Sequence, residues 1–210
     1  MIDNYNDLSI GKYQEIMVLI NGEELDKLQM QTSLISILSD EDEDDILNLP
    51  LSEYNKRVQR TAFLQTEPPK RIVATSYKLG GMHLETMLNL REMTAGQYID
   101  YQTFVKEPDK YLVELLSVFL IPKGKKYNDD YDIIEVQKVI RENLSIVDAL
   151  SLSAFFLVLS QSLIKVTLTS LKSKVKKMRK KAKNQEEVMK LEQALQHLEN
   201  AGVGLHLLTE

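Results

Sequence analysis

The sequence predicts a mainly α-helical protein in which two related helical units flank a central β-hairpin and a long basic helix follows. Three observations lead to this prediction. A phrase of eight residues occurs twice, a Gly-Gly pair separates two short apolar stretches, and one stretch near the end is strongly basic. We expect five segments in chain order: a first helical unit (residues 1–65), a β-hairpin connector (66–90), a second helical unit (91–170), a basic amphipathic helix that continues from it (171–201) and a tail (202–210).

The repeated phrase reads Leu-Ser-Ile-Gly-Lys-Tyr-Gln-Glu at residues 8–15 and Met-Thr-Ala-Gly-Gln-Tyr-Ile-Asp at residues 93–100. Both copies follow one pattern: apolar, Ser or Thr, any residue, Gly, any residue, Tyr, any residue, acid. Ser9 and Thr94 lie where a helix N-cap belongs, because a hydroxyl there accepts a hydrogen bond from an unpaired amide of the first turn. The phrase therefore predicts the start of a helix in each unit; two unrelated capped helices are the alternative.

The tyrosines of the phrase are the first candidate interaction residues. Tyr13 and Tyr98 fall at the fourth helical position, where each would pack on the apolar residue before the cap as a hydrophobic staple. Gly11 and Gly96 lie in the first turn, where the absence of a side chain lets another segment approach closely. We expect the apolar helix faces around the two tyrosines to bind other proteins.

The first unit continues with three further segments. Residues 10–20 form the first predicted helix, which ends at an Asn-Gly pair, and residues 23–38 carry leucines and isoleucines close to helical spacing. Residues 40–45 are six consecutive acids, which suit a solvated loop that runs into the first turn of the next helix. We favour this interpretation over a metal site, because consecutive acids on a helix point in different directions. A further helix is predicted over residues 49–64.

The connector has the composition of strands and turns. Two prolines at 68–69 end the preceding helix, and residues 72–77 are mostly β-branched or aromatic. Gly80 and Gly81 separate two short stretches, which predicts a β-hairpin with the glycines in its turn. The Gly-Gly pair lacks the lysine and the longer glycine spacing of a phosphate-binding loop. Because an isolated hairpin is marginally stable, we expect it to pack on helices or to add to a partner's sheet.

The second unit repeats the order of segments of the first unit, with different segment lengths. After the helix that Thr94 opens, we expect helices over residues 110–121 and 133–142, and a further helix opened by a capping box of Ser145 with Asp148. Residues 149–164 carry no charge. They are fewer than the roughly 20 apolar residues of a membrane span and include four serines, so we expect a buried helix and no membrane association.

The stretch at residues 172–183 carries eight basic residues and no acid, while the other 198 residues carry a net charge of −13. No residue from 155 to 200 breaks a helix, and a narrow heptad-like stripe near its end would suit a partner helix. The candidate contacts of the stripe are Leu191, Leu195 and Leu198. The candidate contacts of the basic stretch are Lys172, Lys174, Lys176, Lys177, Arg179, Lys180, Lys181 and Lys183. This stretch would bind nucleic-acid phosphates by charge or pair with an acidic protein surface, and the acidity of the remaining chain favours the protein surface.

Catalytic and metal-binding patterns are missing from the sequence. The chain contains no cysteine, which excludes disulfides, thiolate metal sites and cysteine nucleophiles and agrees with a reducing compartment. The three histidines show no metal-type spacing, and no nucleophile elbow or kinase signature is present. We expect no enzyme activity and no cofactor. The N-terminal residues lack a basic region followed by an apolar core, so no secretory signal is predicted.

The phrases at residues 8–15 and 93–100 and the hairpin sequence at 77–81 resemble small α-helical proteins of tailed bacteriophages, namely tail assembly chaperones and minor virion structural proteins, including those of crAss-like phages of Bacteroides. The resemblance covers about residues 8–165. It implies a protein that acts in tail or virion assembly by binding tail or capsid proteins or further copies of itself. It places the protein in the host cytoplasm during assembly or in the virion, and it carries no functional residue over. The alternative is a nucleic-acid-binding protein that uses the basic stretch.

Overall fold

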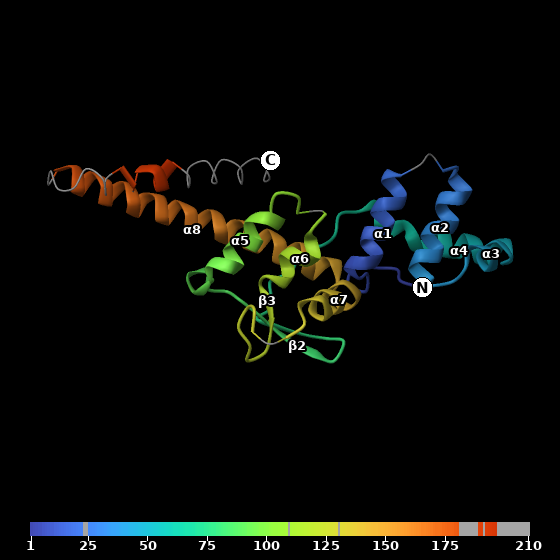
Figure 1. The fold of residues 1–210 in the computed structure, drawn as a ribbon. Helices are drawn as coiled ribbons and strands as arrows, with labels where there is room; N and C mark the ends of the chain where they lie inside the picture. The colour runs from blue at the N-terminus through green and yellow to red at the C-terminus, as the bar shows by residue number, and fades with distance from the viewer. Residues whose placement is uncertain (23–24, 109, 130, 181–188, 191, 197–210) are drawn as a thin grey trace. The chain divides into compact units, whose positions relative to one another are not determined.

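The computed structural model describes residues 1–22, 25–108, 110–129, 131–180, 189–190 and 192–196 (Figure 1). The chain divides into two compact units, Met1–Ser153 and Ala154–Glu210. The described residues are mainly helical with one small antiparallel sheet, as the sequence predicts.

Two antiparallel helices begin the first unit. Helix α1 (Ile10–Asn21) starts at Ser9, whose hydroxyl accepts from the amide of Lys12 at 3.4 Å. Helix α2 (Lys27–Ser39) starts at Asp26, which forms a capping box with Gln29. The predicted start at residue 23 is therefore wrong, because the capping box of Asp26 sets the beginning of α2 later. The two helices lie side by side (Figure 1).

The acidic run leads into the first turn of a helix, as predicted, but that helix is a separate short one before the helix predicted at residues 49–64. Helix α3 (Glu43–Leu47) has three acids in its first turn, where they complement the partial positive charge of the helix end. Helix α4 (Leu51–Arg60) and the 3-10 helix η1 (Thr61–Gln65) follow. The helices α2, α3 and α4 meet in a small core of Ile35, Ile46 and Tyr54. The Tyr54 hydroxyl lies 3.2 Å from that of Thr32, so the buried polar atoms satisfy each other.

The predicted hairpin is present, and it gains a third strand from the same chain. Strand β1 (Ser76–Leu79) pairs with strand β2 (Met82–Thr86) across Gly80 and Gly81, which have φ angles of +52° and +82°. Positive φ at both turn residues is the geometry that a two-residue hairpin turn requires. Strand β3 (Leu120–Pro122) pairs with β2, giving the order β1-β2-β3.

One prediction at the sheet is wrong. Residues 120 and 121 are strand rather than the end of a helix, because helix α6 (Leu112–Ser117) stops early and the following residues pair with the open edge of β2. A continuous apolar run does not distinguish a buried strand from a buried helix, so the sequence left this choice open. The β-branched residues 72–75 precede β1, and Ile72 is 92% exposed.

The second half of the unit packs helices against this sheet. After the 3-10 helix η2 (Leu90–Glu92), helix α5 (Ala95–Phe104) starts with the predicted capping box of Thr94 and Gln97. Gln97 is buried, and its Nε2 donates to the carbonyl of Val118 at 3.1 Å, which ties the start of α5 to the segment before β3. Tyr101 packs edge-on against Phe119 with ring centroids 5.6 Å apart. Helix α7 (Ile133–Asn143) begins at Asp132 and packs on α1 and α6.

The start of the long helix α8 (Ile146–Lys180) is joined to the start of α1. Ser9 and Ser145 form an antiparallel β-bridge, in which the amide of Ile10 donates to the carbonyl of Leu144 at 3.2 Å and the amide of Ile146 donates to that of Leu8 at 2.8 Å. The Ser145 hydroxyl accepts from the Asp148 amide at 3.1 Å, so the predicted cap of this helix is confirmed.

Beyond Ser153 the described chain is helical. Helix α8 ends at Lys180, and residues 189–190 and 192–196 are again helical. Of the predicted basic amphipathic helix at 171–201, the structure therefore describes the beginning and two short stretches, and residues 181–188 lie outside the described chain.

Candidate protein-binding surface

Tyr13 and Tyr98 lie on helices that pack against different partners. Tyr13 is half-buried on α1, which packs on α2 and α7. Tyr98 is 38% exposed on α5, which packs on α6. The predicted packing of each tyrosine on the residue before its cap stays a prediction. Tyr98 is the better placed of the two to contact another protein, because its neighbour Ile99 is also exposed.

The two glycines of the repeated phrase differ. A Cβ atom built at Gly11 would lie 3.3 Å from Cγ and 3.4 Å from the carbonyl oxygen of Arg141, so α7 approaches α1 closely at this position. A Cβ atom at Gly96 would meet its nearest neighbour, Nδ2 of Asn128, at an ordinary 3.5 Å. The close approach that the sequence predicts is confirmed at Gly11, whereas Gly96 does not need to be glycine for space.

The final acids of the two phrases also play different parts. Glu15 is exposed on α1. Asp100 accepts a hydrogen bond from the Tyr127 hydroxyl at 2.7 Å. Burial and this bond together raise the pKa of Tyr127 well above its usual value. The phrase therefore fixes a helix start in both units but does not repeat a binding site.

The candidate basic contacts are described in part. Lys172, Lys174, Lys176 and Lys177 are exposed on α8. The backbone of Arg179 and Lys180 is helical, but their side chains lie outside the described part, as do Lys181 and Lys183. Among the candidate apolar contacts, Leu195 is half-buried in a helical stretch, whereas Leu191 and Leu198 lie outside the described residues.

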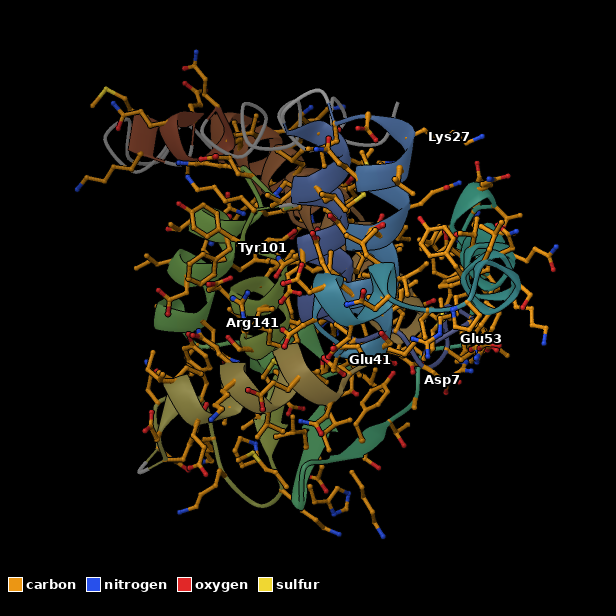
Figure 2. All side chains as sticks on the ribbon, turned by 90° about the vertical axis from the view of Figure 1, so that its right-hand side faces the viewer. Asp7, Lys27, Glu41, Glu53, Tyr101 and Arg141 are labelled. Atoms are coloured by element: carbon orange, nitrogen blue, oxygen red, sulfur yellow. The ribbon has the colours of Figure 1, made fainter. Side chains whose placement is uncertain are left out.

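A shallow groove, which the sequence did not predict, runs between α1 and α2. Its volume is about 560 Å³. Residues of both helices line it together with Glu43 of α3 and Arg141 of α7. Arg141 is labelled in Figure 2. The residues that line it are Gly11, Gln14, Glu15, Val18, Leu19, Ser33, Ser36, Ile37, Glu43 and Arg141. We call this feature the α1–α2 groove.

Apolar side chains are exposed around one end of the α1–α2 groove. Val18, which lines it, is 73% exposed, and Met17 and Ile20 on the same helix are also exposed. Leu28, in the first turn of α2, is exposed as well. A sequence signal for this surface existed: residues 16–20 are all apolar, which is more than one buried helix face uses.

Most polar groups that line the α1–α2 groove already have partners within the chain. The Ser33 hydroxyl donates to the Glu43 carboxylate at 2.6 Å, and the Ser36 hydroxyl donates to the carbonyl of Glu41 at 2.7 Å. Nη1 of Arg141 donates to Oε1 of Gln14 at 2.8 Å. A small-molecule site usually offers several convergent free polar groups. This groove has few of them, so its features are those of a surface that receives apolar side chains.

Of the six acids at residues 40–45, Glu43 lines the groove, and the other five divide into two sets. Asp40 pairs with Lys12 at 2.7 Å, and both carboxylate oxygens of Glu41 accept from Nη1 of Arg57 at 2.8 Å. The hydrogen bond from Arg57 holds the pKa of Glu41 below its usual value. The second set is Asp42, Asp44 and Asp45, which form no ion pair with any described residue.

The described residues contain no group of three or more side chains that could hold a metal ion. Within the same part of the chain, none of the helices has both the length and the apolar character that crossing a membrane requires. No protein-family model matches the chain, and no curated protein or solved structure matches it significantly.

Proposed function

We propose that this chain is a non-enzymatic bacteriophage protein that acts in tail or virion assembly by binding other proteins. The observation that carries the proposal is the exposed apolar surface at the α1–α2 groove, with Val18 at 73% exposure. Contiguous exposed apolar side chains commonly mark protein interaction sites. The resemblance of the two phrases and the hairpin to small phage proteins supplies the biological setting.

The proposal has two forms that differ in the lifetime of the contact. As a tail assembly chaperone, the protein would cover apolar surface on an unassembled tail protein in the host cytoplasm and then leave. As a virion structural component, it would keep the same contact with tail or capsid proteins in the finished particle. Burying one valine side chain contributes about 1.5–3 kcal/mol, so a few such contacts decide between a transient and a lasting complex.

Mass spectrometry of purified particles, together with deletion of the gene, tests the proposal. Stoichiometric presence in particles supports a structural role, and absence combined with failed assembly of the deletion mutant supports a chaperone. Both forms would be contradicted if the deletion mutant produces normal infectious particles and wild-type particles do not contain the protein.

A second candidate function is nucleic-acid binding through α8. It is favoured by Lys172, Lys174, Lys176 and Lys177, all of which are exposed on one described helix. Lysines that neutralise phosphates release counterions, so such binding weakens steeply as salt rises. Titrating the protein with double-stranded DNA at about 50 mM and about 200 mM salt checks it. The absence of binding at the lower salt concentration would rule this function out.

A further inference from the structure

The two compact units carry opposite net charges. Met1–Ser153 contains 26 acidic and 16 basic residues, a net charge of −10. Ala154–Glu210 contains 10 basic and 5 acidic residues, a net charge of +5. Copies of such a chain attract one another most strongly when the basic unit of one faces the acidic unit of another.

On the acidic unit, unpaired carboxylates coincide with the exposed apolar surface. Glu15 lines the α1–α2 groove one helical turn from Val18, and it forms no ion pair with any described residue. Asp42, Asp44 and Asp45 are neighbours in the chain of Glu43, which also lines the groove. The one lining cation among the described residues is Arg141, which already donates to Gln14 and lies against Gly11. The end of the groove at Val18 therefore combines apolar and acidic character.

On the basic unit, lysines of α8 have the complementary character. Lys174, Lys176 and Lys177 are exposed and form no ion pair with any described residue. Lys174 and Lys177 are three positions apart, so they lie on one face of the helix. A lysine carries a long apolar stem below its ammonium group, so it can cover a valine and reach a carboxylate at the same time.

We propose that the α1–α2 groove of one copy binds the part of α8 that carries Lys174, Lys176 and Lys177 in a second copy of this chain. The lysine stems cover Val18, and the ammonium groups pair with Glu15 and with the acids before and within α3. The groove and these lysines are different surfaces, so the contact builds either a two-fold dimer, in which each groove binds the lysines of the other copy, or a ring or a filament. This inference deepens the proposed function, because it rests on the chain acting by protein binding and names a further copy as one partner.

Two charge-reversed full-length variants test the contact. Glu15→Lys damages the groove but keeps the basic stretch, and the double variant Lys174→Glu/Lys177→Glu does the reverse. We expect the wild type to form oligomers at about 50 mM salt that dissociate at about 500 mM, because exposed charges are screened. Each variant alone should associate at least about tenfold more weakly. An equimolar mixture should associate again, because the intact groove of one variant binds the intact stretch of the other and the two reversed surfaces are again opposite in charge.

Sedimentation velocity at several concentrations gives the readout. Three results would each overturn the proposal: the wild type stays monomeric at all concentrations, the variants associate as the wild type does, or the mixture does not associate. If the stretch binds the groove of its own chain instead, the wild type stays monomeric. Val18→Lys should weaken association, whereas Ile72→Lys, at an exposed position before β1 and outside the groove, should not. Circular dichroism melting confirms folding of each variant. A monomeric protein that is nevertheless present in particles would overturn this inference and leave the proposed function standing.

Discussion

Ser9 and Ser145 face each other in an antiparallel β-bridge, and each of them also caps the helix that follows it. The two bridge strands are the identical tripeptides Leu8-Ser9-Ile10 and Leu144-Ser145-Ile146, whose isoleucines and leucines are almost completely buried. Two helices that are distant in sequence therefore start at one buried point. This junction holds α1, one wall of the α1–α2 groove, in place.

The first prediction concerns the two caps. Replacing an N-cap serine by alanine costs about 0.5–2 kcal/mol of stability. We expect Ser145→Ala to cost more than Ser9→Ala, because the Ser145 hydroxyl accepts at 3.1 Å and also donates to Asp148 at 2.8 Å, whereas Ser9 accepts at 3.4 Å. Urea unfolding at neutral pH measures both. Ser52→Ala, at an exposed position of α4, is the control; equal losses at Ser9 and Ser145 would contradict this ranking.

The second prediction concerns the close approach at Gly11. Alanine is favoured over glycine within helices by up to about 1 kcal/mol. We expect Gly96→Ala to gain part of this stability, because its new methyl group meets no neighbour closer than 3.5 Å. Gly11→Ala should gain less or lose stability, because Arg141 would have to move away. Thermal melting of both variants measures the change in stability. An equal gain in stability at the two positions would show that α7 does not approach α1 closely at Gly11.

The third prediction concerns the hairpin turn. A non-glycine residue in the left-handed region costs about 1–2 kcal/mol. Gly81 has a φ of +82° and open space around it, so Gly81→Ala should lose stability through the backbone alone. Gly81→Asn should lose less, because asparagine tolerates this region better. Chemical unfolding of the two variants measures the difference. A Gly81→Ala variant as stable as the wild type would contradict the turn geometry.

The fourth prediction concerns pH. The pKa of Glu41 is lowered in the folded protein, chiefly by its hydrogen bond from Arg57. A lowered folded pKa contributes stability that is fully present above the unfolded pKa and is lost as pH falls through the folded pKa. We therefore expect Glu41→Gln to be less stable than the wild type at neutral pH and the difference to shrink at acidic pH.

Urea midpoints measured from about pH 7 down to about pH 3 give this comparison, since the ordinary glutamate pKa is about 4.3. Glu15→Gln is the matched control, because Glu15 is exposed and forms no ion pair with a described residue. A stability difference for Glu41→Gln that stays constant over this range would contradict the role of the Arg57 bond.

The fifth prediction concerns the tyrosines of the repeated phrase. We expect Tyr13→Ala to lower the melting temperature more than Tyr98→Ala does, because Tyr13 is half-buried and Tyr98 is exposed. Neither change should remove a specific activity if both residues act at helix starts. Variants with unchanged melting temperatures that no longer bind a tail or capsid protein would instead show that the tyrosines are surface contacts.

The features that the sequence predicted correctly depend on neighbouring residues. The caps at Ser9 and Thr94 and the turn at Gly80 and Gly81 are set by side chains and φ angles within a few positions. The fold class follows from these local signals and from the periodicity of the helices, and it is confirmed.

The features that it missed depend on distant partners. Leu120 and Ile121 are strand because β2 offers them an edge, which no local pattern reveals. The α1–α2 groove was missed for a similar reason. Residues 16–20 are apolar throughout, and only the packing of α1 on α2 and α7 decides that Ile16 is buried while Val18 stays exposed. The identical tripeptides at Ser9 and Ser145 were a readable signal of the bridge that the sequence analysis did not use.

The most direct test of the proposed assembly function is particle yield from phage that encode Val18→Lys or Ile72→Lys in place of the wild-type chain. The two substitutions add the same charge to exposed positions, but only Val18 lines the α1–α2 groove. Our account predicts that Val18→Lys sharply lowers the number of complete particles while Ile72→Lys leaves it near the wild-type value. Equal, undiminished yields from the two variants, with the Val18→Lys protein folded, would contradict it.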